Sequence, residues 1–240
     1  MATPLSIGLI IPSANRLTEP QFNTYLPAGV GAFVTRLRMA GKHRKPLAEL
    51  KPSLIEAAEA LSDVKPNVIV FHCTANSMES GLDHEKAIVD IIKQASGCPT
   101  ITTAQALTQA FDHVGIKKLV LISPYVQATN QLEVNYLSET GYTVLHEKGL
   151  ALDSQAYSTV TPEEWIKVVK ENLRADSDGY FLSCTNTRMI ETITDLERDL
   201  GKPVINSNQA TIWACLKKMG ISHADTRLGH FFNSSVNPLQ

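Results

Sequence analysis

The chain has 240 residues, of which 43% are hydrophobic and 19% are charged, and its formal net charge is −2 at pH 7. This composition is that of a globular protein with a sizeable core, and the charge argues against a nucleic-acid-binding protein or one that binds an acidic membrane surface. No segment approaches the roughly 18 apolar residues of a membrane span, and the first residues lack the positively charged region of a signal peptide. We therefore expect a cytoplasmic protein without nucleic-acid or membrane partners.

Eight short runs rich in Val, Ile and Leu predict β-strands. Several of them show no polar alternation, which is typical of parallel strands buried on both faces. In chain order the predicted strands are 7–11, 32–38, 67–72, 99–103, 118–123, 142–147, 179–183 and 203–206.

Segments with apolar residues at helical spacing lie between the predicted strands. The clearest helix start is TPEE, where Thr161 caps the helix and Glu164 completes a capping box. Alternation of strands and helices predicts an α/β fold with parallel sheets and right-handed crossovers. The predicted helices are 53–64, 84–96, 105–114, 129–140, 163–173 and 189–200, with a last helix after Asn208.

An internal repeat divides the chain into two similar halves. LIIPSAN is followed by VFHCTANS and CPTITTAQA in the first half, and VLISPYV is followed by FLSCTNTR and KPVINSNQA in the second. The spacing from Pro12 to Cys73 is 61 residues, and the spacing from Pro124 to Cys184 is 60. The repeat predicts two lobes, each a roughly four-stranded parallel sheet flanked by helices, related by a pseudo-twofold with the active site between them.

The boundary between the predicted lobes falls near Gly115. We place the first lobe at residues 1–115, together with the C-terminal helix and tail at 207–240. The second lobe covers residues 116–206. The C-terminal helix is expected to pack back on the first lobe.

Each half ends one buried strand in Cys-Thr, at Cys73 and at Cys184. Ligands of open parallel sheets bind beyond the carboxyl ends of the strands, so the two cysteines are expected to meet across one cleft. Two thiols on opposite sides of a substrate suit stereochemical inversion or double-bond isomerisation. A helix N-terminus after each strand would favour the thiolate. Cys98 and Cys215 are interpreted as small buried hydrophobic residues, and with no CxxC pair we expect no metal site.

Other polar residues follow the same predicted strand ends. Asn15 in PSAN and Tyr125 in SPYV follow the first strand of each lobe, where a site role is favoured over a plain turn. His72 is expected to point away from the cleft, because alternation places it on the other side from Cys73. The residues after the two cysteines are either helix N-caps or ligand contacts: Thr74, Asn76, Thr185 and Asn186.

These motifs resemble the aspartate/glutamate racemase superfamily, in the branch of maleate cis-trans isomerases and arylmalonate decarboxylases. The resemblance covers nearly the whole chain and rests on PSANRLTEPQF, TRLRMAG, HCTANSM, SPYVQATNQ and SCTNTR. It implies an enzyme with no metal and no organic cofactor, which binds a substrate carboxylate through hydroxyls and backbone N–H groups. By this resemblance the substrate-binding residues are Asn15, Thr74, Ala75 through its backbone, Tyr125, Val126 and Thr185.

The resemblance also assigns roles to the cysteines. In maleate isomerases the cysteine matching Cys73 attacks one olefinic carbon and the cysteine matching Cys184 protonates the other, so that the central bond rotates. Arylmalonate decarboxylases carry glycine in place of Cys73, which favours a two-cysteine isomerase or racemase here. Ser154 stands where maleate isomerases often have an asparagine, and we count it among the substrate-binding residues.

The favoured hypothesis is a cofactor-independent cis-trans isomerase of a small dicarboxylate, of the maleate-to-fumarate type, with Cys73 as nucleophile and Cys184 as acid/base. One alternative is a racemase of an amino acid or hydantoin by two-cysteine proton transfer, for which Glu19 or Asp153 would hold an amino group. The other is a non-catalytic small-acid-binding protein of the same fold. The expected partner is a small carboxylate substrate, and the protein is expected to be a homo-oligomer.

Overall fold

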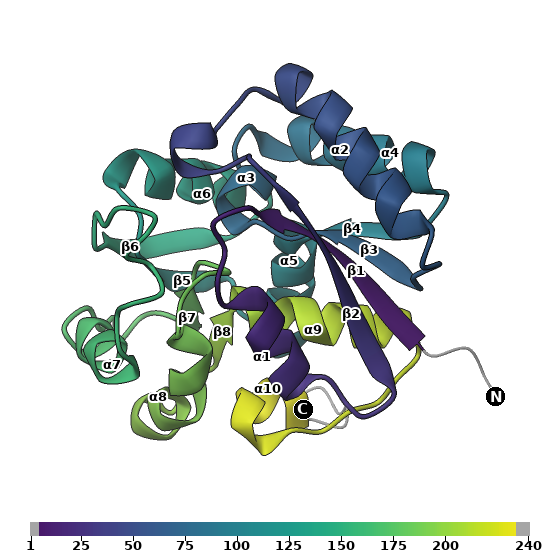
Figure 1. Ribbon diagram of the computed structural model, residues 1–240. Helices are drawn as coiled ribbons and strands as arrows, with labels where there is room; N and C mark the ends of the chain where they lie inside the picture. Colours follow the sequence, from purple (N-terminus) through teal and green to yellow (C-terminus); the bar gives the residue numbers. More distant parts are fainter. Residues whose placement is uncertain (1–4, 234–240) are drawn as a thin grey trace.

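The computed structural model describes residues 5–233, which form two four-stranded parallel sheets (Figure 1). The strand order is β2-β1-β3-β4 in the first sheet and β6-β5-β7-β8 in the second. Because the two orders correspond strand for strand, the predicted α/β fold of two similar lobes is confirmed. The strands are β1 (Leu5–Pro12), β2 (Val30–Leu37), β3 (Val68–Phe71), β4 (Thr100–Thr102), β5 (Lys118–Ser123), β6 (Thr143–Gly149), β7 (Gly179–Leu182) and β8 (Val204–Asn206).

Helices connect the strands and cover both sheets, and their bounds follow in chain order. They are α1 (Thr18–Tyr25), the 3₁₀ turn η1 (Gly41–His43), α2 (Leu47–Ser62), α3 (Thr74–Ser77), α4 (Gly81–Ser96), α5 (Thr103–Val114), α6 (Gln127–Glu139), α7 (Pro162–Lys170), the 3₁₀ turn η2 (Met189–Thr192), α8 (Ile193–Leu200), α9 (Ser207–Lys218), the 3₁₀ turn η3 (Thr226–Leu228) and α10 (Gly229–Asn233). In this part of the chain, no helix is both long and apolar enough to cross a membrane.

Local sequence explains where several helices begin. The predicted capping box is present at α7, where the Thr161 side chain accepts from the Glu164 backbone N–H and the Glu164 carboxylate accepts from that of Thr161. A second capping box, between Asn206 and Gln209, begins α9. The two boxes satisfy backbone N–H groups at the starts of α7 and α9, which would otherwise lack a partner within the helix.

Several elements differ from the sequence-based expectation; α2, for example, begins at Leu47 and not at residue 53. The sequence patterns do not predict α1, because its buried face includes the polar Thr18 and Gln21 beside Phe22 and Tyr25, which hides the apolar period. The predicted helix at 189–200 begins instead as the 3₁₀ turn η2 and becomes α-helical only at Ile193.

One hydrophobic core runs through both sheets. It joins Ile7 and Leu9 of β1 to Leu119 and Leu121 of β5, with Leu107 of α5 packed between the sheets. Helices α5 and α9 pack on each other, and both contact β8, while α2 and α4 lie side by side on the other face of the first sheet (Figure 1). The shared core therefore holds the two lobes in a fixed arrangement.

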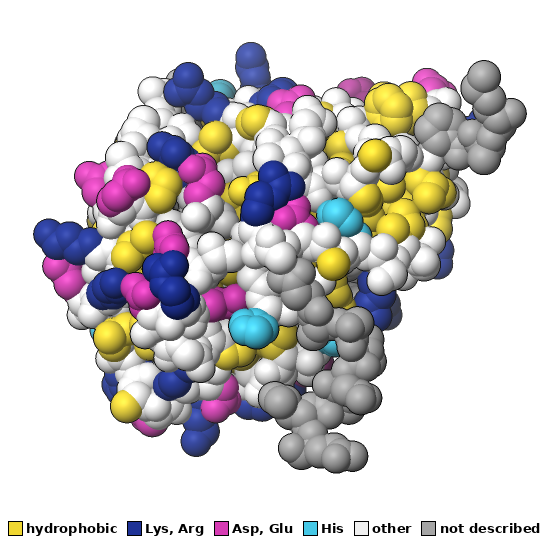
Figure 2. Space-filling view, turned by 90° about the horizontal axis from the view of Figure 1, so that it is seen from below, with side chains coloured by type: hydrophobic (Ala, Val, Ile, Leu, Met, Phe, Trp, Pro, Cys, Tyr) yellow, Lys and Arg dark blue, Asp and Glu magenta, His cyan; other side chains and the backbone are white. Residues whose placement is uncertain are grey.

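The carboxyl ends of the parallel strands lie at matching positions. In the first sheet Pro12 is in register with Leu37, and Phe71 with Thr102. The segments that follow β1, β2 and β3 therefore leave the sheet at one edge, and the equivalent segments of the second sheet do the same. On the face shown in Figure 2, Lys and Arg side chains are interspersed with Asp and Glu, in keeping with the small net charge.

Candidate active site

The two cysteines predicted to react meet around one hydroxyl group, that of Ser207. The Thr74 hydroxyl, next to Cys73, donates to Ser207 Oγ at 2.9 Å, and the Cys184 backbone N–H donates to the same oxygen at 3.2 Å. Both cysteine side chains are buried. The thiols are close enough that the charge of Cys73 raises the pKa of Cys184. The strand ends of the two lobes thus bring Cys73 and Cys184 together at one site.

Backbone conformation marks Cys184 as unusual. Its φ is +146°, in a region that is normally open only to glycine. A non-glycine residue there carries roughly 1–3 kcal/mol of strain, and such residues cluster at functional sites. The hydrogen bond from its N–H to Ser207 and the bond from the Asn186 N–H to its Sγ at 3.3 Å hold this conformation in place.

The predicted helix N-terminus follows Cys73 but not Cys184, and at both thiols burial outweighs the groups that favour the thiolate. Burial raises the pKa of Cys73 to about 12 and that of Cys184 to about 12. A hydrogen bond from the Asn76 backbone favours the thiolate and opposes the rise only in part, while the Asn76 side chain accepts from the Cys73 thiol at 3.2 Å. Helix α3 after Cys73 has only four residues, and no helix follows Cys184 before Met189, so neither thiol gains a strong dipole.

Two tyrosines border the thiols. The Tyr125 hydroxyl lies beside Cys184 and opposes the burial-driven rise in the thiol pKa. The Tyr157 ring packs edge-on against that of Tyr125, with centroids 5.5 Å apart. Burial raises the pKa of both tyrosines, and the charges of the two cysteines raise it further. Tyr157 was not predicted, although ALDSQAY carries it three residues after Ser154.

The segment that carries Tyr157 is held against the strand end of β5. Leu150 N–H donates to Ser123 O at 3.1 Å, and Ala151 N–H to Tyr125 O at 3.0 Å. Gly149 makes this approach possible, since a Cβ there would lie 2.2 Å from Tyr125 O. The half-buried Ser154 lies against Gly41 of the first lobe, so this segment bridges both lobes.

Asn15 is buried and joins the lobes rather than presenting a free amide. Its Nδ2 donates to Thr185 Oγ1 at 3.0 Å, and its Oδ1 accepts from the backbone N–H groups of Leu17 and Thr18. Thr18 Oγ1 also donates to Thr185 O at 3.2 Å. These bonds place Thr185 beside the cysteines and orient its hydroxyl.

His72 lies in a buried network behind the site, in agreement with its expected direction. Its Nε2 lies 2.8 Å from Asn208 Oδ1 and its Nδ1 lies 2.9 Å from Thr103 Oγ1. Asn208 Nδ2 donates to Gln21 and to Thr185 O, so Asn208 Oδ1 is an acceptor and the imidazole proton is on Nε2. Burial lowers the pKa of His72 to about 4, which keeps the ring neutral. Its role here is to fix the network.

Ser207 and Asn208 were not predicted as part of the site. The internal repeat carries the signal that could have found them, because KPVINSNQA aligns Ser207 with Thr103 of CPTITTAQA. Thr103 and Ser207 each begin a helix directly after the last strand of a lobe. The residues after the cysteines are not side-chain caps: Cys73 itself is the N-cap of α3, and Thr192 is that of α8.

The remaining predicted residues lie at the edge of the cluster. Val126 is 45% exposed and is the N-cap residue of α6. Ala75 is half-buried in α3. Glu19 pairs with Arg36, and Asp153 is exposed and accepts from Gln155 N–H, so neither carboxylate faces the thiols unpaired. Arg188, three residues after Thr185, pairs with Glu191.

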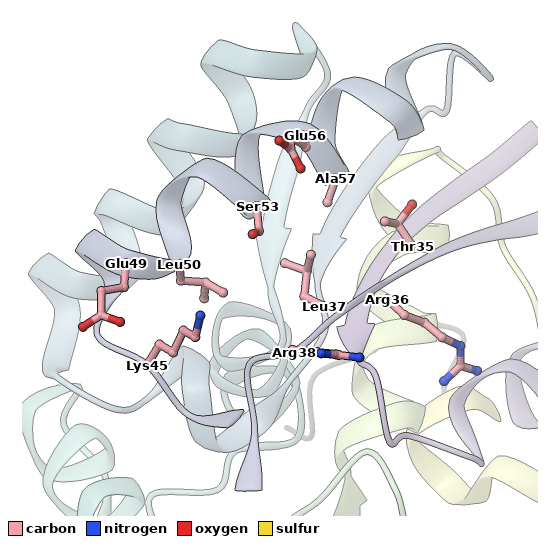
Figure 3. Close-up of a pocket in the computed structure, with 10 residues that line it drawn as sticks. All are labelled: Thr35, Arg36, Leu37, Arg38, Lys45, Glu49, Leu50, Ser53, Glu56 and Ala57. Atoms are coloured by element: carbon pink, nitrogen blue, oxygen red, sulfur yellow. The ribbon is translucent and has the colours of Figure 1, made fainter. Parts of the chain in front are cut away.

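A hollow of about 400 Å³ lies elsewhere, between β2 and α2 (Figure 3). Arg36, Arg38, Lys45, Glu49 and Glu56 are among the residues that line it. Neither cysteine nor any other predicted site residue belongs to its lining. It is therefore a separate surface feature from the cysteine cluster.

Comparison with known proteins finds maleate isomerases and arylmalonate decarboxylases that match nearly the whole chain. A maleate isomerase of Pseudomonas putida is 27% identical over 229 residues, 90% of this chain and 92% of the relative. An arylmalonate decarboxylase of Bordetella bronchiseptica is 23% identical over 222 residues, 91% of this chain and 92% of the relative. A solved maleate cis-trans isomerase mutant of Nocardia farcinica, with a covalently bound succinylcysteine intermediate, is 19% identical with a TM-score of 0.87, covering 97% of this chain and 99% of that one.

These relatives agree with the predicted superfamily branch and with the predicted enzyme class. The model of the arylmalonate decarboxylase family matches residues 7–232, which is almost the whole chain. The chain belongs to the arylmalonate decarboxylase family.

Proposed function

We propose that this protein is a cofactor-independent cis-trans isomerase of a small dicarboxylate of the maleate type, in which Cys73 and Cys184 both react. The observation that carries the proposal is the meeting of the two cysteines at Ser207, one from each lobe, with Cys184 in a strained conformation. Retention of Cys73 favours an isomerase over a decarboxylase within the family. The Pseudomonas putida relative, a maleate isomerase, supports the substrate class.

In the reacting form Cys73 is a thiolate and Cys184 is a thiol, so the pair shares one proton; with both pKa values near 12, this form is a small fraction of the protein at pH 7. Cys73 Sγ forms a bond to one olefinic carbon, and the electron pair of the double bond moves toward the neighbouring carboxylate as an enediolate. The Cys184 thiol gives its proton to the second carbon. The central bond is then single and rotates. Cys184 takes the proton back, the C–S bond breaks and the trans acid leaves with Cys73 again a thiolate.

Polar groups around the cysteines suit the two substrate carboxylates. The Thr74 and Thr185 hydroxyls and the Tyr125 hydroxyl lie around the thiols, and the backbone N–H groups at the start of α6 lie beyond Tyr125. Such donors stabilise charge that grows on a carboxylate as the enediolate forms. Asn15 orients Thr185, and Ser154 lies on the segment that bridges the lobes.

Proton NMR of the protein with maleate in heavy water tests the proposal. Wild type and Cys98→Ser, the control at a partly exposed cysteine, are expected to produce fumarate. Cys73→Ser and Cys184→Ser should each lose about 10²–10⁴-fold in rate, since each removes one reacting group. Full turnover by either variant would refute the two-cysteine mechanism. Deuterium uptake at the α-carbon of an amino acid or hydantoin, without fumarate formation, would favour the racemase.

A further inference from the structure

A buried carboxyl group with no assigned role lies behind the two cysteines. Glu133 on α6 has no exposed surface, and neither carboxyl oxygen has a hydrogen-bond partner among the described residues. The hydroxyl of Ser183, directly before Cys184, is also buried without a hydrogen-bond partner among these residues. Ser183 lies close enough to Glu133 to act on its pKa, although no hydrogen bond of ordinary geometry joins them.

Glu133 lies near enough to the reacting cluster to act on it electrostatically. Its charge acts on four groups of the site and raises the pKa of each one, as a nearby negative charge must. These groups are Cys73, Cys184, Tyr125 and Tyr157. Among the carboxyl groups in the described part of the chain, Glu133 is the one that acts on all four.

Other ionisable groups on the elements packed against α6 do not neutralise Glu133. On β6, Glu147 accepts from the Asn130 amide, His146 bonds to Asn172, and Lys148 is exposed. On α4, Glu85 accepts from the Tyr136 hydroxyl at 2.7 Å and from Thr102. The remaining charged groups acting on Cys73 are Glu79 and Arg44, which pair with each other at 2.9 Å.

An ionised carboxylate in such a place is unfavourable, since burial without a partner costs several kcal/mol and the group keeps its proton instead. Burial accordingly raises the pKa of Glu133 to about 8, and Ser183 only opposes the rise. At pH 7 Glu133 is therefore mostly a neutral carboxylic acid. Above pH 8 it becomes an additional negative charge beside both thiols.

We propose that Glu133 is a positioning residue that controls the charge of the active site: protonated, it allows thiolate formation and the binding of a doubly negative substrate, and ionised, it opposes both. The first effect concerns the thiols alone. The second rests on the proposed function, because it requires a dicarboxylate. A merely structural Glu133 would alter stability without altering the pH dependence of either step.

Alkylation by iodoacetamide, followed separately at Cys73 and Cys184 by mass spectrometry between pH 6 and pH 10, tests the first effect without any substrate. In wild type the alkylation rate should rise with pH. Above pH 8 it should be about tenfold lower than the rate in Glu133→Gln, because the ionised Glu133 carboxylate opposes thiolate formation and charges in a protein interior interact strongly. Glu85→Gln is the matched control: Glu85 is also a buried carboxyl, but it has hydrogen-bond partners and does not act on the cysteines. It should keep the wild-type profile.

Parallel profiles for wild type and Glu133→Gln would overturn the proposal. Glu133→Leu provides a second variant without an unpaired polar group, and it should match Glu133→Gln. The KM for maleate gives the second readout: it should rise above pH 8 in wild type and stay level in Glu133→Gln. A difference between the alkylation profiles of wild type and Glu133→Gln, with no maleate turnover, would support Glu133 as the controlling group while contradicting maleate as the substrate.

Discussion

Asn15 and Thr185 come from different lobes and are 170 positions apart, yet the Asn15 amide donates to Thr185 Oγ1 at 3.0 Å and to Thr185 O at 3.3 Å. The same side chain accepts from two backbone N–H groups at the start of α1. Asn15 therefore joins the lobes with its two amide donors, while its oxygen holds the start of α1 in its own lobe. We expect its contribution to a reaction to be the placement of Thr185.

Asn15→Ala is expected to lower the free energy of unfolding by about 1–3 kcal/mol, because it leaves buried polar groups unpaired. Activity should fall as well, since Thr185 loses the bond that orients it. Urea unfolding and maleate turnover measure the two effects. Asn135→Ala, at an exposed position of α6, is the control and should change neither. An Asn15→Ala protein with wild-type stability would contradict this role.

Substitutions at Cys184 test the backbone strain. Alanine normally stabilises a protein more than glycine, but at φ +146° glycine avoids the strain that any other residue carries. Cys184→Gly should therefore be more stable than Cys184→Ala by about 1 kcal/mol. Cys73, with φ −151°, is the internal control, and there the alanine variant should be the more stable. Thermal unfolding of the four variants gives the comparison, and the same order at both positions would argue against strain at Cys184.

The sequence was sufficient to predict the two sheets and the meeting of Cys73 and Cys184 at one site, for a physical reason. Strands such as β5 are buried on both faces and so appear as uninterrupted apolar runs. The repeat then places Cys73 and Cys184 at equivalent strand ends. Helix α1 remained hidden because half of its buried face is polar and bonds to the second lobe, as Gln21 does to Thr187 O.

The features that the sequence did not reveal depend on long-range geometry. The raised pKa values of the two thiols follow from complete burial, which no local pattern reports. Ser207 joins both cysteine segments only because α9 returns to the site after β8. Glu133 resembles an ordinary helix-surface residue in QLEVNYL, and only the packing of α6 against the site reveals its burial.

The buried neutral His72 predicts a dependence of stability on acid pH. Its pKa is about 4 in the folded protein and about 6.5 when unfolded, so the unfolded chain binds more protons between these values. The contribution to stability is complete above pH 6.5 and is lost as the pH falls toward 4, by roughly 3 kcal/mol in total. Urea unfolding of wild type and His72→Gln between pH 4 and pH 7 measures it.

The His72→Gln protein should be less stable at pH 7, and its stability should decline less steeply on acidification than that of wild type. His230→Gln, at an exposed position, should follow the wild-type curve. Parallel curves for wild type and His72→Gln would show that the His72 imidazole has the same pKa in the folded and the unfolded protein, which would contradict its burial in a neutral network.

A double-mutant cycle tests whether the Ser207 hydroxyl couples the two cysteine segments. Thr74→Val removes the donor from the first lobe, whereas Ser207→Ala also leaves the Cys184 N–H unpaired in a buried place. Ser207→Ala should therefore be the more destabilising by about 1–3 kcal/mol, the cost of one orphaned buried donor. The coupling energy between the two substitutions should be about 1 kcal/mol, since they share one hydrogen bond. Additive effects in urea unfolding would mean that Ser207 serves the second lobe alone, and Thr74 would then be free to bind a substrate carboxylate without disturbing Cys184.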